Sequence, residues 1–229
     1  MKRKSRPLTR RPPRLHPRKR ILVICEGAQT EPSYFSGLKN VEQARAVEVE
    51  IDDSGGVPKT LVERAVERKR SASRAARSVK DQNLLYDEIW CVFDVDEHPK
   101  LEDSKQQALA HAIKLAISNP CFELWLLLHF RDHRSSIERH LLQAECRICM
   151  PKFVKSVDFN QLKDRVDAAV ERAIQLEKWQ TERYNFGQNP STTVHKLVQT
   201  IKVNGRQLSM PPAPAPNSEA SEEQAGPIP

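Results

Sequence analysis

The chain has 229 residues and a formal net charge of +7, which is enough length for one substantial domain with a core of its own. Residues 1–20 hold ten of the 37 lysines and arginines and no acid, whereas residues 207–229 hold three glutamates and no base, so residues 21–206 are neutral. No apolar run approaches the roughly 20 residues that a transmembrane helix needs, and the composition therefore excludes a membrane-spanning protein.

The two ends of the chain are predicted to be disordered. They contain ten of the sixteen prolines, and neither can bury enough apolar surface to offset the entropy that is lost on ordering. At the N-terminus, ten cations without counter-charges favour an arm that binds nucleic acid. A localisation signal and a tail that only improves solubility are the alternatives.

Alternating strands and helices are predicted for the first part of the neutral region. Residues 21–25 are a continuous apolar run rich in β-branched side chains, which is typical of a buried strand. Pro32 suits the first turn of a helix that begins near Thr30. Apolar and acidic residues alternate over residues 47–52, which predicts a half-exposed strand, and helical periodicity over residues 57–79 predicts a helix with a basic outer face.

The alternation continues before helices take over. Residues 89–93 predict a third strand and residues 113–117 a fourth, although the fourth run also suits an extension of the helix predicted over residues 101–112. Residues 122–130 are too apolar for an amphipathic helix and predict a buried one. Amphipathic helices follow near residues 135–147, 159–178 and 191–203.

This order of elements predicts an α/β fold. Strands that alternate with helices form mainly parallel sheets with right-handed crossovers, so we expect a sheet of about four strands flanked by helices, with a helical C-terminal extension. The predicted divisions are a basic arm, an α/β domain, a helical extension packed on it and an acidic Pro-rich tail, at residues 1–20, 21–134, 135–206 and 207–229.

Acidic side chains directly follow two of the predicted strands. Glu26 comes after the first strand, and Asp94 and Asp96 come after the third. Functional groups in parallel sheets gather at the carboxyl ends of the strands, and side chains two residues apart in an extended segment point to the same side. Such a group of carboxylates suits Mg²⁺, or Mn²⁺ in its place. The alternative is that these acids are solvated loop residues or helix caps.

Glu123 is an isolated acid in the apolar run of residues 122–130. A buried carboxylate without a partner is costly, so either it pairs with His129 or an arginine, or it faces the metal site. His129 itself is predicted to be a core histidine. Lys152 and Lys155 are predicted to be solvated, with phosphate contact as the alternative.

The five cysteines, without a signal peptide, indicate reduced thiols and a cytoplasmic protein. Cys146 and Cys149 are spaced as in half of a zinc site, with His133 and His140 nearby. The histidine spacing is irregular and the sequence holds no second pair of this kind, so ordinary packing is the stronger prediction.

Four segments of the chain, in order, resemble the signature motifs of the RloB-like family. Together they extend over about residues 21–203, which is nearly the whole region between the two tails. The segments are Cys25-Glu26-Gly27 with Thr30-Glu31-Pro32 and Tyr34-Phe35; Phe93-Asp94-Val95-Asp96-Glu97; Ser118-Asn119-Pro120 with Phe122-Glu123 and the run from Trp125 to Phe130; and Asn189-Pro190-Ser191-Thr192 with Val194-His195 and Leu197.

The RloB-like family resembles the Toprim fold of primases, topoisomerases and overcoming-lysogeny-type nucleases. The resemblance therefore implies a Toprim-like sheet and a nuclease that hydrolyses phosphodiester bonds with Mg²⁺. It also favours the placement of Glu123 at the metal site. The residues that it implies for catalysis are Glu26, Asp94, Asp96 and Glu123, and those that it implies for the metal are Glu26, Asp94, Asp96 and Glu31.

The resemblance further implies a role in bacterial anti-phage defence by abortive infection, with DNA or RNA (tRNA included) as the substrate and an ABC-type or AAA-type ATPase as the partner. The chain contains no G-x-x-x-x-G-K-[ST] motif, so ATP hydrolysis would come from that partner. Two other functions stay open. One is a catalytically silent module that binds nucleic acid or docks on the ATPase, and the other is a phosphotransferase or sensor for small nucleotides.

Overall fold

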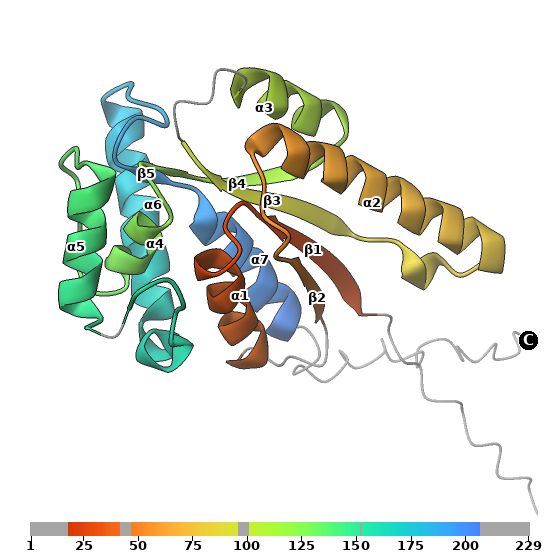
Figure 1. Ribbon diagram of the computed structural model, residues 1–229, viewed down its shortest axis with the longest axis horizontal. Helices are drawn as coiled ribbons and strands as arrows, with labels where there is room; N and C mark the ends of the chain where they lie inside the picture. The colour runs from red at the N-terminus through yellow and green to blue at the C-terminus, as the bar shows by residue number, and fades with distance from the viewer. Residues whose placement is uncertain (1–17, 42–46, 96–100, 152, 207–229) are drawn as a thin grey trace, which may run out of the picture.

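The computed structural model describes residues 18–41, 47–95, 101–151 and 153–206. The centre of the molecule is a sheet of five strands in the order β2-β1-β3-β4-β5 (Figure 1). The first four strands are parallel to one another, and β5 runs antiparallel to β4. The strands are β1 (Lys19–Cys25), β2 (Val47–Asp52), β3 (Glu88–Asp94), β4 (Lys114–Asn119) and β5 (Ser191–Thr192).

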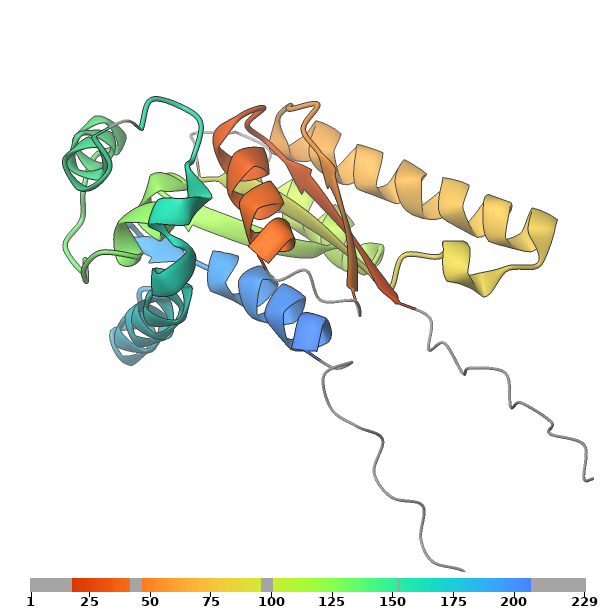
Figure 2. The same ribbon diagram turned by 90° about the horizontal axis from the view of Figure 1, so that it is seen from below.

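Helices cover both faces of this sheet, which lies between α2 on one side and α7 on the other (Figure 2). The first face carries α2 (Pro58–Val79) and α3 (Leu101–Ala110). The second face carries α1 (Thr30–Val41), α4 (Glu123–Leu128) and α7 (Val194–Arg206), and α4 also contacts α5 (Arg139–Cys149) and α6 (Val166–Glu182). Single 3₁₀ turns lie at η1 (Gln82–Leu84), η2 (Phe159–Gln161) and η3 (Lys163–Arg165).

Alternation along the strands explains this three-layer arrangement. In β1, the side chains of Ile21, Val23 and Cys25 pack on the α1 side of the sheet, whereas those of Leu22 and Ile24 pack on the α2 side. All five side chains are fully buried. Because both faces are covered, β1 is apolar at every position from Ile21 to Cys25, as expected for an inner strand of a parallel sheet.

The predicted α/β fold with a mainly parallel sheet is confirmed, and the structure contains all four predicted strands. Residues 114–117 of the run predicted at 113–117 belong to β4 and do not extend α3, because the chain turns at Ala112, which has a positive φ of 52°. The fifth strand, Ser191–Thr192, was not predicted, since two polar residues carry no periodic signal. It comes from the predicted helical extension and completes the edge of the sheet beside β4.

Most of the two predicted tails, at residues 1–17 and 207–229, lies outside the described residues. The last three residues of the predicted basic arm, residues 18–20, are described. Lys19 and Arg20 open β1, and Arg20 Nε lies 3.3 Å from an oxygen of Glu48. Within the described ranges, no helix combines the length and the apolar composition needed to cross a lipid bilayer.

The strand order places the carboxyl ends of β1 and β3 side by side. From β1 the chain crosses to β2 at one edge of the sheet, and it then returns past β1 to form β3. At such a switch point of an open α/β sheet, the connections leave the two strands in opposite directions and open a crevice where ligands bind. Glu26 follows β1 and Asp94 ends β3, so both lie at this point.

Candidate active site

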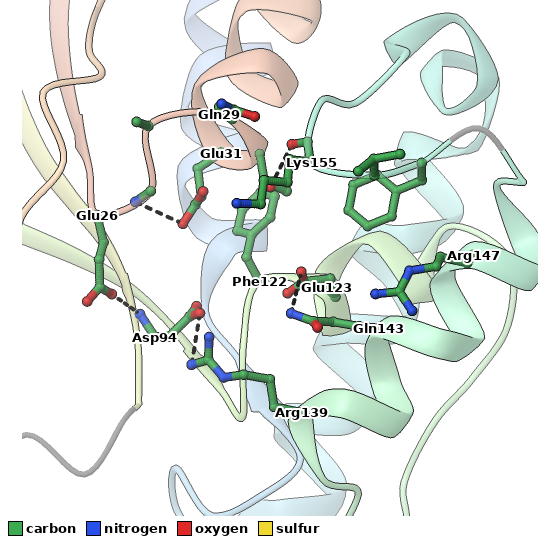
Figure 3. Close-up of a pocket in the computed structure, with 15 residues that line it drawn as sticks. Glu26, Gln29, Glu31, Asp94, Phe122, Glu123, Arg139, Gln143, Arg147 and Lys155 are labelled. Carbon is green, nitrogen blue, oxygen red and sulfur yellow. Dashed lines mark hydrogen bonds and ion pairs between the residues drawn. The ribbon is translucent and has the colours of Figure 1, made fainter.

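A cavity of about 470 Å³ lies at the carboxyl ends of β1 and β3 (Figure 3). Four acids line it, namely Glu26, Glu31, Asp94 and Glu123, and we call this cavity the carboxylate pocket. The helix α5 and the loop that follows it contribute cations and an amide: Arg139, Gln143, Arg147 and Lys155. The pocket therefore brings together acids from the end of β1, α1, β3 and α4, and cations from α5 and the loop after it.

Backbone contacts hold Glu26 over the end of β3. Its Oε2 accepts a hydrogen bond from the N–H of Asp94 at 2.8 Å, and its own N–H donates to the carbonyl of Val92 at 2.9 Å. Its carbonyl accepts the N–H of Gly56 at 3.2 Å. Gly56 has a φ of 139°, which a residue with a side chain rarely adopts. The turn after β2 therefore needs a glycine to make this contact, and Glu26 links the ends of three strands.

Glu31 lies in the first turn of α1 and is almost completely buried. Its Oε1 accepts the N–H of Gly27 at 3.3 Å. A Cβ at position 27 would lie 2.3 Å from Oε2 of Glu31, so a glycine lets this carboxylate come close to the chain after β1. Burial raises the pKa of Glu31, the charges of Glu123 and Glu26 raise it further, and the N–H of Gly27 acts in the opposite direction.

Asp94 ends β3, and only 12% of its side chain is exposed. Burial raises its pKa well above the usual value, and the negative charges of Glu31, Glu123 and Glu26 act in the same direction. Arg139 opposes them, since its Nη2 lies 3.3 Å from Oδ2 of Asp94. Carboxylates that repel one another in a buried site bind either protons or a cation. The electrostatics of the pocket therefore favour either a bound proton or a bound cation at these carboxylates.

Glu123 opens α4 and lines the pocket, where its Oε1 accepts a hydrogen bond from Nε2 of Gln143 at 3.1 Å. The buried His129 has other partners, because Nε2 lies 3.3 Å from the hydroxyl of Tyr34 and Nδ1 lies 3.0 Å from the carbonyl of Trp125. Glu123 therefore lies at the carboxylate pocket, and its predicted role toward a metal ion stays a prediction. His129 lies in the core.

The three pocket residues that α5 contributes were not predicted from the sequence, namely Arg139, Gln143 and Arg147. They are spaced four residues apart on α5, so they lie on one face of that helix. This spacing is the signal in the sequence, but it is equally typical of a solvated helix face. Lys155, for which phosphate contact was an alternative, also lines the pocket, and its carbonyl accepts the hydroxyl of Thr30 at 2.7 Å.

Carboxylate oxygens are the ligands that Mg²⁺ prefers. Asp96, the predicted partner of Asp94, lies outside the described residues, as do Glu97 and Lys152. In the part of the chain that the structure describes, no group of three or more His, Cys, Asp or Glu side chains is arranged to hold a metal ion. Among these residues there is therefore also no zinc site of the kind considered for Cys146 and Cys149. Mg²⁺ keeps several waters and is commonly bound through one or two carboxylates and a substrate phosphate. Glu26 and Asp94 fit this mode of binding.

A family described as RloB-like protein matches residues 21–201 of the chain. The chain belongs to this family. No curated protein and no solved structure matches it. In this RloB-like protein, every residue that lines the carboxylate pocket, from Glu26 to Lys155, falls within the matched range. The pocket is therefore part of the region that defines family membership and not of the two tails.

Proposed function

We propose that this RloB-like protein is a metal-dependent phosphodiesterase that hydrolyses nucleic acid. The observation that supports it most is the carboxylate pocket, where four acids meet two arginines and a lysine. A phosphodiester is negatively charged, so acids alone would repel it. Acids that hold a divalent cation, beside side chains that donate to phosphate oxygens, attract it.

Glu26 and Asp94 are the proposed ligands of Mg²⁺, and Asp96 is added because of its spacing from Asp94 in the sequence. When bound, the ion supplies a Lewis acid for the phosphate and lowers the pKa of a bound water. Arg139 is 40% exposed and contacts Asp94, so its guanidinium can exchange this carboxylate for the oxygens of an arriving phosphate. That exchange leaves the oxygens of Asp94 to the cation.

The remaining residues of the pocket support a polymeric substrate. Arg139 and Arg147 are eight positions apart on α5, which corresponds to about 12 Å along the helix axis. This distance spans more than one phosphate group, so the two arginines suit neighbouring phosphates of one strand. Glu31 and Glu123 add negative charge that attracts the cation into the pocket.

The family resemblance supports the biological setting of this activity. We propose a role in bacterial anti-phage defence, with an ATPase as the partner. The ATPase activity would come from a separate chain, because this sequence lacks a phosphate-binding G-x-x-x-x-G-K-[ST] loop.

The test is to incubate the purified protein, alone and with its ATPase, with labelled DNA, RNA and tRNA in Mg²⁺, in Mn²⁺ or in EDTA. We expect cleavage of one of these polymers with either metal ion and none in EDTA. Binding without cleavage under every condition would support the catalytically silent module instead. Turnover of free nucleotides without cleavage of polymers would support the phosphotransferase or sensor.

A further inference from the structure

A hydrogen-bonded loop near the carboxylate pocket exposes two aromatic rings. We call residues 183–190, which join α6 to β5, the aromatic loop. Tyr184 is 86% exposed and Phe186 is 65% exposed. Arg183, at the start of the loop, lies over the ring of Trp179, with its Cζ 4.5 Å from the ring centroid. Two exposed aromatic side chains within three residues are a candidate binding surface.

The conformation of Tyr184 is unusual for its residue type. It has a φ of 54° and lies just after the end of α6, where its N–H donates to the carbonyl of Thr181 at 3.2 Å. The N–H of Asn185 donates to the carbonyl of Gln180 at 3.0 Å. This pair of bonds caps the C-terminus of a helix, and its left-handed position is normally a glycine because a Cβ is strained there. A tyrosine weakens the cap, and strain of this kind concentrates at functional sites.

The backbone of the aromatic loop is fixed although its side chains are exposed. The buried side chain of Gln180 donates from Nε2 to the carbonyl of Gln188 at 2.7 Å. On the other side of the loop, Asn189 exchanges two hydrogen bonds with the backbone of Ile137, at 2.8 and 3.1 Å. A loop that is already ordered loses little conformational entropy when a ligand binds.

A short series of contacts connects the aromatic loop to the carboxylate pocket. Asn119, the last residue of β4, donates from Nδ2 to the carbonyl of Gly187 at 2.9 Å. The carbonyl of the next residue, Pro120, accepts from Nη2 of Arg139 at 3.3 Å, and Arg139 pairs with Asp94. The loop therefore lies at the same edge of the sheet as the pocket and is connected to it through Asn119, Pro120 and Arg139.

Phe186 also lines a second cavity, of about 300 Å³. Val95, the residue directly after Asp94, lies in the wall of this cavity, as does Lys105 of α3. Consecutive residues at the end of a strand point to opposite sides, so the two cavities lie on either side of the end of β3. A volume of this size is at the lower end of the range for small-ligand sites.

We propose that the aromatic loop binds an unpaired nucleobase of a single-stranded nucleic acid by stacking on Tyr184 and Phe186. The inference rests on the proposed function, since it specifies that the nucleic acid whose backbone crosses the carboxylate pocket is single-stranded. Bases in a duplex are stacked on one another and present only their edges, whereas unpaired bases stack on aromatic side chains.

The size of the exposed surface favours a nucleobase over a protein partner. A specific protein interface buries about 800 Å² on each side. Two aromatic side chains provide at most about 150–250 Å² each, and their neighbours Arg183, Asn185 and Gln188 are polar and exposed. This surface suits one or two bases, with a cationic side chain beside them.

The affinity for oligonucleotides, measured by fluorescence anisotropy in EDTA so that no cleavage occurs, tests this proposal. Three probes of equal length are compared, namely a single strand, the same strand with abasic sites throughout, and a duplex. We expect the single strand with bases to bind most tightly to the wild type. The double variant Tyr184→Gly, Phe186→Ala should bind it roughly tenfold or more weakly, which corresponds to the loss of about one stacked base. Its affinity for the abasic strand should not change.

Single variants separate a binding role from a structural one. Tyr184→Gly relieves the strain of the helix cap, so its melting temperature should stay constant or rise by up to roughly 2–4 °C, while its affinity for the single strand falls. Tyr184→Phe keeps the ring and should bind as the wild type does. Leu109→Ala removes a side chain of α3 that is 82% exposed, and it should also leave binding unchanged.

Equal affinity of the double variant and the wild type for the single strand would overturn the proposal, and so would an equal loss on the abasic strand. A double variant that binds every probe normally but no longer binds an ATPase partner would show a protein-docking loop instead. The proposed hydrolysis fails separately, because a protein that cleaves nothing can still show the expected binding pattern. Metal-dependent cleavage with unchanged affinities would refute the stacking site alone.

Discussion

Replacing Glu123 with glutamine distinguishes a carboxylate that serves the pocket from one that stabilises the core. The substitution keeps the shape of the side chain, and Gln143, 3.1 Å from Oε1, can still donate to the new amide oxygen. Exchange of a charge-assisted for a neutral hydrogen bond costs about 1 kcal/mol. Weaker repulsion of Glu31, whose pKa Glu123 helps to raise, acts in the opposite direction. We therefore expect the free energy of unfolding to change by less than about 1 kcal/mol.

The same variant should bind Mg²⁺ more weakly. A pocket of about 470 Å³ is roughly 10 Å across, and a divalent cation attracts one carboxylate at about that distance by about 2–3 kcal/mol when the effective dielectric constant is about 20–40. Screening by salt lowers this value, so we expect roughly tenfold weaker binding. Urea melts and calorimetric Mg²⁺ titrations of the same preparations measure both quantities.

Glu145→Gln is the matched control. Glu145 lies on α5 and pairs with Arg131 outside the carboxylate pocket, so its substitution should leave the affinity for Mg²⁺ unchanged. A role of Glu123 in the pocket is excluded if Glu123→Gln lowers the free energy of unfolding by about 3–5 kcal/mol, as expected when a buried ion pair is broken, and still binds Mg²⁺ as the wild type does.

Three further predictions concern the N-terminal arm, the metal and the core. Deletion of residues 1–17, which carry seven lysines and arginines, should leave the melting temperature unchanged. It should reduce the slope of log affinity for nucleic acid against log salt concentration by about 0.7–0.9 for each phosphate that the arm neutralises in the wild type. An unchanged slope would show that the arm only aids solubility. Mg²⁺ at ten times its Kd should stabilise the wild type by about 1.4 kcal/mol but not Asp94→Asn, and equal stabilisation of both in thermal melts would place the ion elsewhere. Burial lowers the pKa of His129 from 6.5 to about 4. Between these two pH values the unfolded state binds a proton that the folded state does not. The contribution of His129 to the free energy of unfolding should therefore be fully present above pH 6.5 and decline as the pH falls toward 4. In urea melts across this pH range, the free energy of unfolding of His129→Gln should decline less steeply than that of the wild type. Equal declines in the two proteins would contradict this prediction.

The parts of the fold that could be predicted are those with strong local patterns. The run that forms β1 is apolar at every position from Ile21 to Cys25, because a central parallel strand is covered on both faces. Once the strands are parallel, the acids that follow them must lie at one edge, which is why Glu26 and Asp94 could be expected to meet. Asp96 lies outside the described residues, so its place at the pocket stays a prediction.

The parts that could not be predicted depend on tertiary packing. Arg139 and Arg147 reach the pocket only because α5 packs on α4. No local sequence pattern predicts that these two helices contact each other. β5 forms because Ser191 and Thr192 pair with the end of β4, a contact across more than seventy residues. The left-handed backbone of Tyr184 is likewise invisible in the sequence, since tyrosine favours other conformations.

Asp94→Asn gives the most direct test of the proposed active site, with Asp103→Asn as its control, because Asp103 is exposed in the first turn of α3. Both substitutions remove one charge and keep the shape of the side chain, and melts establish that both variants are folded. The measurement is single-turnover cleavage, in Mg²⁺, of the nucleic acid that the wild type prefers. We expect Asp103→Asn to cleave at the wild-type rate, and Asp94→Asn to bind the nucleic acid but to cleave it at least roughly 100-fold more slowly. Equal cleavage by both folded variants would contradict the assignment of the carboxylate pocket as the active site.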